Sequence, residues 1–310
     1  MRRLRLPLWM AALALGGLAA LWTGATKAQT PAAPATPPAA TGPGGQGNPQ
    51  FPAGRGGPGP IPKKHLLVVG QTRGFHHGST SNAMATFWKL GKESGLWDTE
   101  IRTDWEWVTK KPAGSEAHNI DWFDAIALVN TTGTWSADDE SRAALLAFVR
   151  DEGKGLVAAH AALDANYNWP EYKDMLGGWF KAHPWGTFDA PVIVEDPTFP
   201  AMRHFPARFR MYDEMYSPRE WSRDQVNVLM RMDDSQLDYT KTPYGAPRED
   251  HDQALAWAKM YGKGRVFYST FGHVNEAWDN PDVQKMYLEA VEWVMKRTEG
   301  SVKPHPRVNP

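Results

Sequence analysis

A short apolar run in the middle of the chain, Gly155-Leu-Val-Ala-Ala, ends in a histidine, His160. Small and branched apolar residues of this kind are typical of a strand in a parallel sheet, where helices cover both faces. His160 then lies at the C-terminal end of the strand, and ligands of open α/β sheets bind outside those ends. Two interpretations stay open from position alone: a functional histidine, or a buried histidine bonded to a backbone carbonyl.

The apolar run belongs to a series of expected strands and helices. Earlier strands are expected at residues 65–69, 99–102 and 125–129, and helices follow the first and the third. This order predicts an α/β domain with a mostly parallel sheet and helices on both faces. The later part of the chain is β-rich before a closing helix, with strands expected at residues 191–195, 208–212, 225–230, 254–260 and 265–270. We therefore expect one α/β domain over residues 63–298 with an added β-rich region.

The two ends of the chain differ in composition from the middle. Residues 1–28 combine a basic start, an apolar run and a small-residue exit, the pattern of a secretory signal peptide, with an uncleaved anchor as the alternative. Residues 29–62 are rich in Pro, Ala and Gly and predict a disordered linker. Residues 299–310 are expected to form a flexible tail. The protein is thus expected in the periplasm or outside the cell, without a membrane span after signal cleavage.

The chain contains no cysteine. This excludes disulfides, thiolate metal sites, a lipoprotein anchor and a cysteine nucleophile. The formal net charge is −1 with 22% charged residues, so no net basic field gathers phosphates, and we expect no nucleic-acid partner. The glycine-rich loop after residue 69 also lacks the phosphate-binding patterns GxGxxG and GxxxxGK(S/T).

Polar residues follow several of the expected strands or lie in their loops. The C-terminal ends of parallel strands meet at one edge of a sheet, so we expect these residues to converge there. Neighbouring His76 and His77 cannot share a face; at most one of them points into a site, and we choose His76. The residues expected at this edge are His76, Thr132, Trp135, His160, His183, Glu214 and His273.

Fifteen tryptophans in the chain favour sugar binding, because aromatic faces combine a large apolar area with geometric specificity. Most of them are expected in the core. Trp135, Trp185 and Tyr216 lie beside the loops of the expected site and are the candidates for a stacking platform. Asp164, just after the His160 strand, joins them as a candidate substrate-binding residue.

Several motifs are specific in their order and spacing: Gly155-Leu-Val-Ala-Ala-His160-Ala-Ala, Ala182-His183-Pro184-Trp185, Asp213-Glu214-Met-Tyr216, and the segment from Tyr261 to His273 followed by Glu292-Trp293. Together they resemble the ThuA-like, or trehalose-utilisation, family over residues 64–297. The resemblance implies a flavodoxin-like sheet of the class I glutamine amidotransferase-like kind. In that wider fold a cysteine nucleophile commonly occupies the strand end where this chain has His160. The absence of cysteine puts amidotransfer by a thiol out of reach.

The resemblance also implies a role in the metabolism of disaccharides, including their 3-keto forms. The ketone of a 3-keto-glycoside acidifies the neighbouring C–H, so a base that removes this proton could start isomerisation or elimination of the glycosidic leaving group. Histidine suits this step because its unperturbed pKa is about 6.5. His160 would be the base or a ligand, and Glu214 the partner acid or base. His183 and His273 would hydrogen-bond the sugar or stabilise enolate charge.

Two alternatives accompany this acid–base hypothesis for a sugar isomerase, lyase or hydrolase. Histidines and a carboxylate could hold a divalent metal that polarises the ketone, with His76, His160 and His183 as candidate ligands, although no HxH or HExxH spacing supports it. A non-catalytic periplasmic carbohydrate-binding module would instead bind sugar without forming a product. In each case the expected partner is a small-molecule carbohydrate. Proximity of His160, His183 and His273 in space would favour a site.

Overall fold

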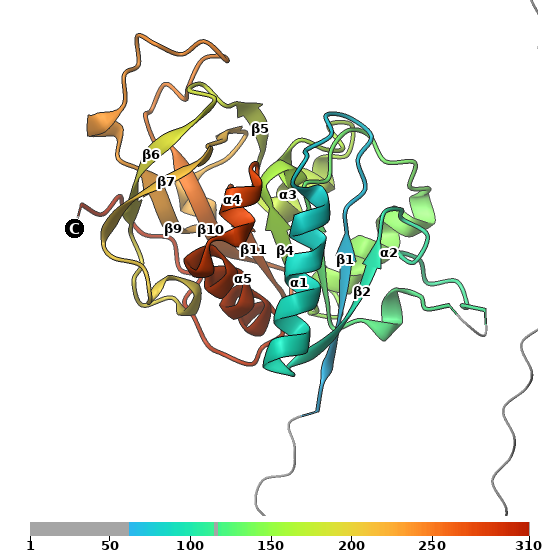
Figure 1. Ribbon diagram of the computed structural model, residues 1–310. Coiled ribbons are helices and arrows are strands. Elements are labelled where there is room, and N and C mark those ends of the chain that lie inside the picture. Colours follow the sequence, from blue (N-terminus) through green and yellow to red (C-terminus); the bar gives the residue numbers. More distant parts are fainter. Residues whose placement is uncertain (1–61, 115–116, 310) are drawn as a thin grey trace, which may run out of the picture. The chain divides into compact units, whose positions relative to one another are not determined.

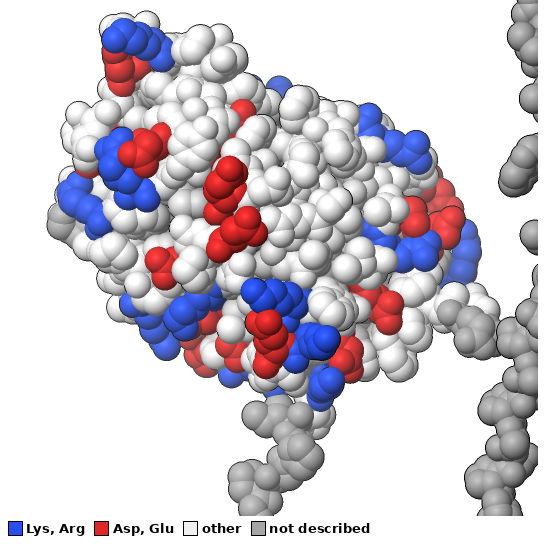
Figure 2. Space-filling view, in the orientation of Figure 1, with Lys and Arg blue, Asp and Glu red and all other residues white. Residues whose placement is uncertain are grey.

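The computed structural model of the protein describes residues 62–114 and 117–309 (Figure 1). The predicted signal peptide, residues 1–28, and nearly all of the predicted linker, residues 29–62, lie outside the described residues. No helix within the described ranges is long and apolar enough to cross a membrane. Figure 2 shows Lys and Arg side chains interspersed with Asp and Glu on one face, where the described residues form no extended area of one sign.

A nine-stranded sheet, in the order β2-β1-β3-β4-β11-β10-β9-β6-β7, forms the centre of the fold. Its first five strands are parallel and have the order of a flavodoxin-like sheet. They are β2 Trp97–Arg102, β1 Lys64–Val69, β3 Ala125–Val129, β4 Gly155–Ala159 and β11 Gly264–Ser269. The predicted α/β class with a mostly parallel sheet is confirmed.

The added β-rich region extends this sheet by four antiparallel strands. They are β10 Ala254–Tyr261, β9 Asn227–Met232, β6 Thr187–Val194 and β7 Arg208–Glu214. A separate antiparallel pair is formed by β5 Trp179–Ala182 and β8 Ser217–Arg219. The β-rich region therefore continues the same sheet as the parallel strands.

Helices cover both faces of the parallel strands, because side chains along each strand alternate between two cores. Leu66 and Val68 of β1 pack into one core, with α1, α4 and α5, whereas Leu67 and Val69 pack into the other, with α2 and α3. The helices are α1 Thr80–Ser94, α2 Asp139–Arg150, α3 Pro170–Leu176, α4 Asn275–Asp279 and α5 Pro281–Val294. Short 3₁₀ helices occupy Ile120–Trp122, His160–Leu163, Pro200–Met202, Arg223–Gln225 and Asp234–Gln236.

The end of β7, the last strand in the sheet order, lies close to the parallel strands. β7 is separated from β11 by three strands in the sheet order, yet Asp213 near its end accepts a hydrogen bond from the backbone N–H of Gly272, at 2.6 Å, just after β11. The backbone N–H of Tyr216 also donates to Thr270 Oγ1 at 3.0 Å. The end of β7 is thereby placed beside the C-terminal ends of β4 and β11.

The C-terminal residues differ from expectation. Residues 299–309, expected to form a flexible tail, contact the sheet: the guanidinium of Arg231 donates to Val308 O at 3.2 Å, and Val308 N donates to Glu195 Oε2 at 3.1 Å. A ring nitrogen of His305 lies 2.9 Å from Val228 O. Arg231 and Glu195 are buried charged residues that need polar partners, and the backbone of the tail supplies some of them.

Candidate functional site

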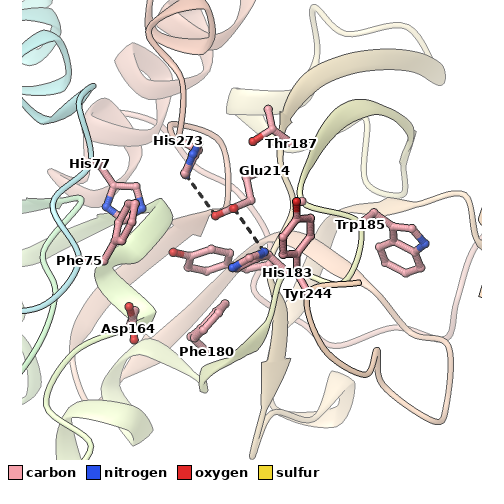
Figure 3. A pocket seen from close by; sticks show the side chains of 12 residues that line it. Phe75, His77, Asp164, Phe180, His183, Trp185, Thr187, Glu214, Tyr244 and His273 are labelled. Atoms are coloured by element: carbon pink, nitrogen blue, oxygen red, sulfur yellow. Dashed lines mark ion pairs between the residues drawn. The ribbon is translucent and has the colours of Figure 1, made fainter. Parts of the chain in front are cut away.

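Five elements of the fold converge on one pocket. The segments after β1, β4, β5 and β11 contain His77, Asp164, His183 and His273, and β7 ends in Glu214. The pocket has a volume of about 590 Å³, a size typical of small-molecule sites. Figure 3 shows Glu214 between His273 and His183 on its wall. The histidines and carboxylates that line the pocket are His77, Asp164, His183, Glu214 and His273.

His160 lies directly after β4, as predicted, and its backbone has a left-handed φ of 46°. Few non-glycine residues adopt this conformation, which marks a strained strand end. Its Nδ1 lies 2.6 Å from Thr270 O; because a carbonyl can only accept, Nδ1 carries a hydrogen, and in the neutral ring Nε2 presents a lone pair. The side chain is 0% exposed. His160 is therefore bonded to a backbone carbonyl and is also part of the site. It lies beneath the pocket and does not line it.

Glu214 connects three histidines. Its Oε2 lies 3.6 Å from His160 Nε2 and 3.1 Å from His273 Nδ1, and its Oε1 lies 3.4 Å from His183 Nδ1. The last pair is close without being aligned for a hydrogen bond. Burial disfavours the charged form of Glu214, but the contacts with His160 and His273 outweigh it and lower the pKa of the carboxyl below its ordinary range. Glu214 is therefore ionised at neutral pH.

The pocket-facing histidine of the adjacent pair is His77, which corrects the choice of His76. His77 is buried, its ring centroid lies 4.9 Å from that of His160 and 5.0 Å from that of His273, and His76 is exposed. The His77 carbonyl accepts from the backbone N–H of Thr80 at 3.2 Å, which ties the residue to the start of α1. Burial, followed by the neighbouring His160 and His273, lowers the pKa of His77 to about 3.

Four residues form a group that could hold a metal ion, and we call them the histidine cluster: His77, His160, Glu214 and His273. One nitrogen or oxygen of each lies within 4.8 Å of those of the others. Of the predicted ligands His76, His160 and His183, only His160 belongs to this cluster. His76 points away because it is the outward neighbour of His77, and His183 contacts only the outer oxygen of Glu214.

The loop that carries His273 is held by polar side chains that the sequence analysis missed. Asp213, which is buried, accepts backbone hydrogen bonds from Gly272, His273 and Val274 at 2.6, 3.0 and 3.2 Å. Ser79 Oγ lies 2.7 Å from Gly272 O, and the Asn130 amide donates to Ser79 Oγ at 2.9 Å. Their positions in the sequence were the signal for this role. Asp213 directly precedes the expected site residue Glu214, and Asn130 directly follows the expected strand at residues 125–129.

Aromatic side chains form the walls of the pocket: Phe75, Phe180, Trp185, Tyr216 and Tyr244. Trp185 and Tyr216 were predicted here, whereas the other three were missed. Tyr244 can lie close to Gly186 because that residue has no side chain: an added Cβ would be 2.7 Å from the Tyr244 ring, and the φ of Gly186 is 63°.

Two predicted substrate-binding residues do not line the pocket. Trp135 is 2% exposed and packs in the core, with its ring centroid 4.2 Å from that of Trp105 and 5.3 Å from that of Tyr172. Trp135 therefore serves packing, because its loop turns inward over α3. Thr132 is buried as well; its Oγ1 accepts from Gly74 N at 3.2 Å and lies 2.8 Å from Phe75 O, which holds the loop that presents Phe75.

Asp164 and His183 are the carboxylate and the histidine that line the pocket outside the histidine cluster. Asp164 Oδ1 accepts from the Tyr167 hydroxyl at 2.6 Å. Burial raises the pKa of Asp164 although the Tyr167 hydrogen bond lowers it. The side chain of His183 is 31% exposed, and its ring lies between those of Phe180 and Tyr244, with centroids at 5.8 and 5.5 Å. Both residues can reach a pocket ligand directly.

Comparisons with known proteins agree with the motifs. The chain matches the model of the ThuA family, described as trehalose utilisation, over residues 65–294. A ThuA-like protein from Bacteroides uniformis has a similar structure, with 21% identity, a TM-score of 0.61, and coverage of 79% of this chain and 95% of that one. One from Parabacteroides merdae is 19% identical, with a TM-score of 0.58 and coverage of 80% and 93%. At these identities the two structures support the fold alone.

No curated protein matches the chain. The family match nevertheless spans the strands, the helices and every member of the histidine cluster, from β1 to α5. The chain therefore belongs to the ThuA, or trehalose-utilisation, family.

Proposed function

We propose that the protein is an exported enzyme that removes the proton next to the ketone of a 3-keto-disaccharide or 3-keto-glycoside. The observation that carries this proposal is the pocket itself, in which aromatic walls surround Asp164, His183 and Glu214. Aromatic faces bind the apolar faces of sugar rings, and the polar residues supply proton transfer. The family description, trehalose utilisation, supports a carbohydrate as the substrate class.

The roles follow from which side chains reach the pocket. His183 is the base: it is partly exposed, and the carboxylate of Glu214, 3.4 Å away, stabilises the imidazolium that forms when His183 takes the proton. Asp164 is the acid that returns a proton. His160, first considered as the base, has no exposed side-chain surface and acts on the substrate only through its neighbours.

The chemistry balances without an oxidant or reductant. His183 removes the proton from the carbon between the ketone and the anomeric carbon, and the C–H electrons form an enolate. In elimination, a C=C bond then forms toward the anomeric carbon, the anomeric C–O bond breaks, and Asp164 protonates the departing oxygen. In isomerisation, the former ketone carbon is instead protonated, and the hydroxyl on the neighbouring carbon becomes the new carbonyl as its hydrogen passes to the former ketone oxygen. Both outcomes share the first proton transfer.

The shared step gives a direct test. The full chain is incubated with 3-keto-trehalose and other 3-keto-disaccharides in D₂O, and NMR and mass spectrometry follow deuterium exchange next to the ketone and the appearance of products. We expect exchange or product with wild type, and a loss of about 100-fold or more in His183→Ala. His76→Ala is the matched control, because His76 is exposed and does not line the pocket.

The competing function is a carbohydrate-binding module without catalysis, which the aromatic walls of the pocket favour equally. Saturable binding of these sugars without exchange or product would support that function and overturn the enzyme proposal. Exchange that is unchanged in His183→Ala would overturn the assignment of the base.

Export rests on the composition of residues 1–28. Cells that express the full chain should contain the protein in the periplasmic or extracellular fraction, with a mature N-terminus near residue 29. A cytoplasmic protein with an intact N-terminus would contradict export and leave the chemistry of the pocket unaffected.

A further inference from the structure

We propose that the histidine cluster, His77, His160, Glu214 and His273, binds one divalent first-row transition-metal ion, with Zn²⁺ as the preferred occupant. Three imidazoles and one carboxylate suit such ions, whereas Mg²⁺ and Ca²⁺ prefer sets of oxygen ligands. The site is argued from geometry alone; its use on a sugar ketone rests on the function proposed above.

The separations between the potential ligand atoms match those around a single ion. Bonds of about 2.0–2.1 Å in tetrahedral geometry place ligand atoms about 3.3 Å apart. His160 Nε2 and His273 Nδ1 are 3.3 Å apart, and Glu214 Oε2 lies 3.6 Å from the former and 3.1 Å from the latter. The fourth ligand atom, from His77, lies within 4.8 Å of the others. Small side-chain rotations would bring all four atoms onto one ion.

The hydrogen bonds around the cluster orient the ligands. Thr270 O accepts a hydrogen bond from His160 Nδ1, so that the lone pair of Nε2 in the neutral ring faces Glu214. A backbone carbonyl on the outer nitrogen is the usual arrangement for a metal-bound histidine, because it sets the tautomer and the ring orientation. Asp213 holds the loop that carries His273 in place, because it accepts hydrogen bonds from the backbone N–H groups of residues 272–274.

A shared proton does not account for the whole cluster. A proton on His273 can form a hydrogen bond to Glu214 or to His160. It then connects only two of the four side chains, and the acceptor atoms of the others still face one another. His77 Nδ1 is buried and has no hydrogen-bond partner among the described residues. A divalent ion would accept lone pairs from all four side chains at once, which explains why an unpartnered histidine is buried beside two others.

The orientation of the cluster gives the ion a catalytic rather than a purely structural environment. His77, Glu214 and His273 line the pocket, and His160 closes the site from beneath. A cation held there has one side toward the pocket, beside His183 and Asp164. A keto oxygen placed against it would be polarised, and the negative charge of the enolate would be stabilised.

Metal binding is tested on the full chain purified without a polyhistidine tag. Chelator-treated protein is titrated with Zn²⁺ by calorimetry, with Mn²⁺ and Mg²⁺ in parallel, and its metal content is measured after desalting. We expect one Zn²⁺ per chain, little binding of Mg²⁺, and a higher Tm with Zn²⁺. His77→Ala and His273→Ala should each weaken Zn²⁺ binding by about 100-fold or more and abolish the Tm increase.

Two matched variants complete the design. His76→Ala removes the exposed neighbour of His77 and should bind Zn²⁺ like wild type. Glu214→Gln replaces the carboxylate with an amide of the same shape and should weaken binding as the histidine variants do. Circular dichroism of each metal-free variant reports whether it folds. Absence of a tight site in wild type, or equal Zn²⁺ affinity in wild type, His77→Ala and His273→Ala, would overturn the proposal.

Failure of the metal site and failure of the proposed function are distinguishable. Tight Zn²⁺ binding that depends on His77 and His273, without deuterium exchange on any keto sugar, would support the metal site and contradict the enzyme. Deuterium exchange by protein that binds no Zn²⁺ and stays active after chelation would support the enzyme and contradict the metal site.

Discussion

Two clusters of charged and polar side chains are buried in this fold, and they are built differently. In the first, Glu195 accepts from both terminal nitrogens of Arg223 at 2.8 and 3.0 Å and lies 2.9 Å from Arg231 Nε. Arg223 also donates twice to Asp252, at 2.7 Å each. We call these four residues the arginine cluster. The second is the histidine cluster, with one carboxylate and three imidazoles.

The difference lies in whether the charges are balanced within the cluster. The arginine cluster has two carboxylates and two guanidinium groups that keep their charge at any physiological pH, so each charge has a permanent partner. The histidine cluster has lone pairs that face one another, and imidazoles can lose their protons. The first arrangement stabilises a fold, whereas the second is suited to receive a cation. Buried charge by itself therefore does not identify a functional site.

The largest effect is expected from breaking the arginine cluster. Glu195→Gln should lower the free energy of unfolding by about 3–5 kcal/mol, because it removes the carboxylate shared by Arg223 and Arg231, which stay charged and keep only Asp252 and Asp234 as charged partners. Urea denaturation measures the loss, and Zn²⁺ affinity should match wild type. Asp98→Asn is the control: its ion pair with Lys63 is 2.8 Å long but exposed, and its loss should cost about 0–1 kcal/mol. Equal losses in the two variants would contradict the comparison.

The same change in the histidine cluster should affect activity instead. Glu214→Gln is expected to reduce turnover of a 3-keto-disaccharide by about 100- to 1,000-fold, because the charge that stabilises the reacting groups is lost. The free energy of unfolding of the metal-free protein should change by less than in Glu195→Gln, because His273 can lose its proton once the carboxylate is gone, whereas a buried arginine cannot. Kinetics and urea denaturation test both parts. A loss of stability as large as that in Glu195→Gln would show that the two clusters serve the same purpose.

The pH dependence of activity should come from the pocket and not from the arginine cluster. Burial raises the pKa of Asp164, so the folded protein keeps this proton to higher pH than a free aspartate does. An acid catalyst works only while protonated, and activity should fall as the pH rises through this raised pKa. Asp164→Asn should reduce kcat by about 100-fold and remove this limb of the profile. A limb that persists in the variant would exclude Asp164 as its source.

The free energy of unfolding should also depend on pH through Asp164, and in the same direction as activity. Between the unfolded and the raised folded pKa of Asp164, the folded state binds more protons than the unfolded state, so this group makes the fold less stable as the pH rises. Asp164→Asn should lack this contribution. Denaturation of wild type and variant across the acidic range measures the difference.

The smallest effect is expected from the aromatic walls. Tyr244→Ala should raise KM for a disaccharide about five-fold and leave kcat nearly unchanged, because the ring contributes contact area and not chemistry. Tyr212→Ala is a suitable control, since Tyr212 is an exposed tyrosine that does not line the pocket. A fall in kcat in Tyr244→Ala would indicate that the ring also positions His183, whose centroid is 5.5 Å away.

Much of the fold was predictable because its signals are local. The strands β1, β3, β4 and β11 are short apolar runs bounded by glycine or polar loops, and their predicted positions are confirmed within one or two residues. Neighbouring residues on each strand enter different cores, as continuous apolar runs require. His160 and His273 follow two of these strands, and so their place at one edge of the sheet could be predicted.

Other parts depended on contacts between distant segments. Residues 299–309 were expected to form a flexible tail, but they contact the sheet, because the buried Arg231 and Glu195 take backbone hydrogen-bond partners from them. Trp135 was a candidate for the pocket but packs against Trp105, which lies far from it in the sequence. Neither partner can be recognised from the local pattern.

The sequence by itself determined the family, the parallel strands, the absence of a thiol and the histidines at the strand ends, because these follow from local apolar patterns and residue identity. Only the tertiary structure decided that His77 rather than His76 faces the site, and that Glu214 reaches it from the far edge of the sheet. The physical reason is that the direction of a loop side chain depends on the segments packed around it. The return of β7 to the end of β11 likewise depends on long-range contacts such as that between Asp213 and Gly272.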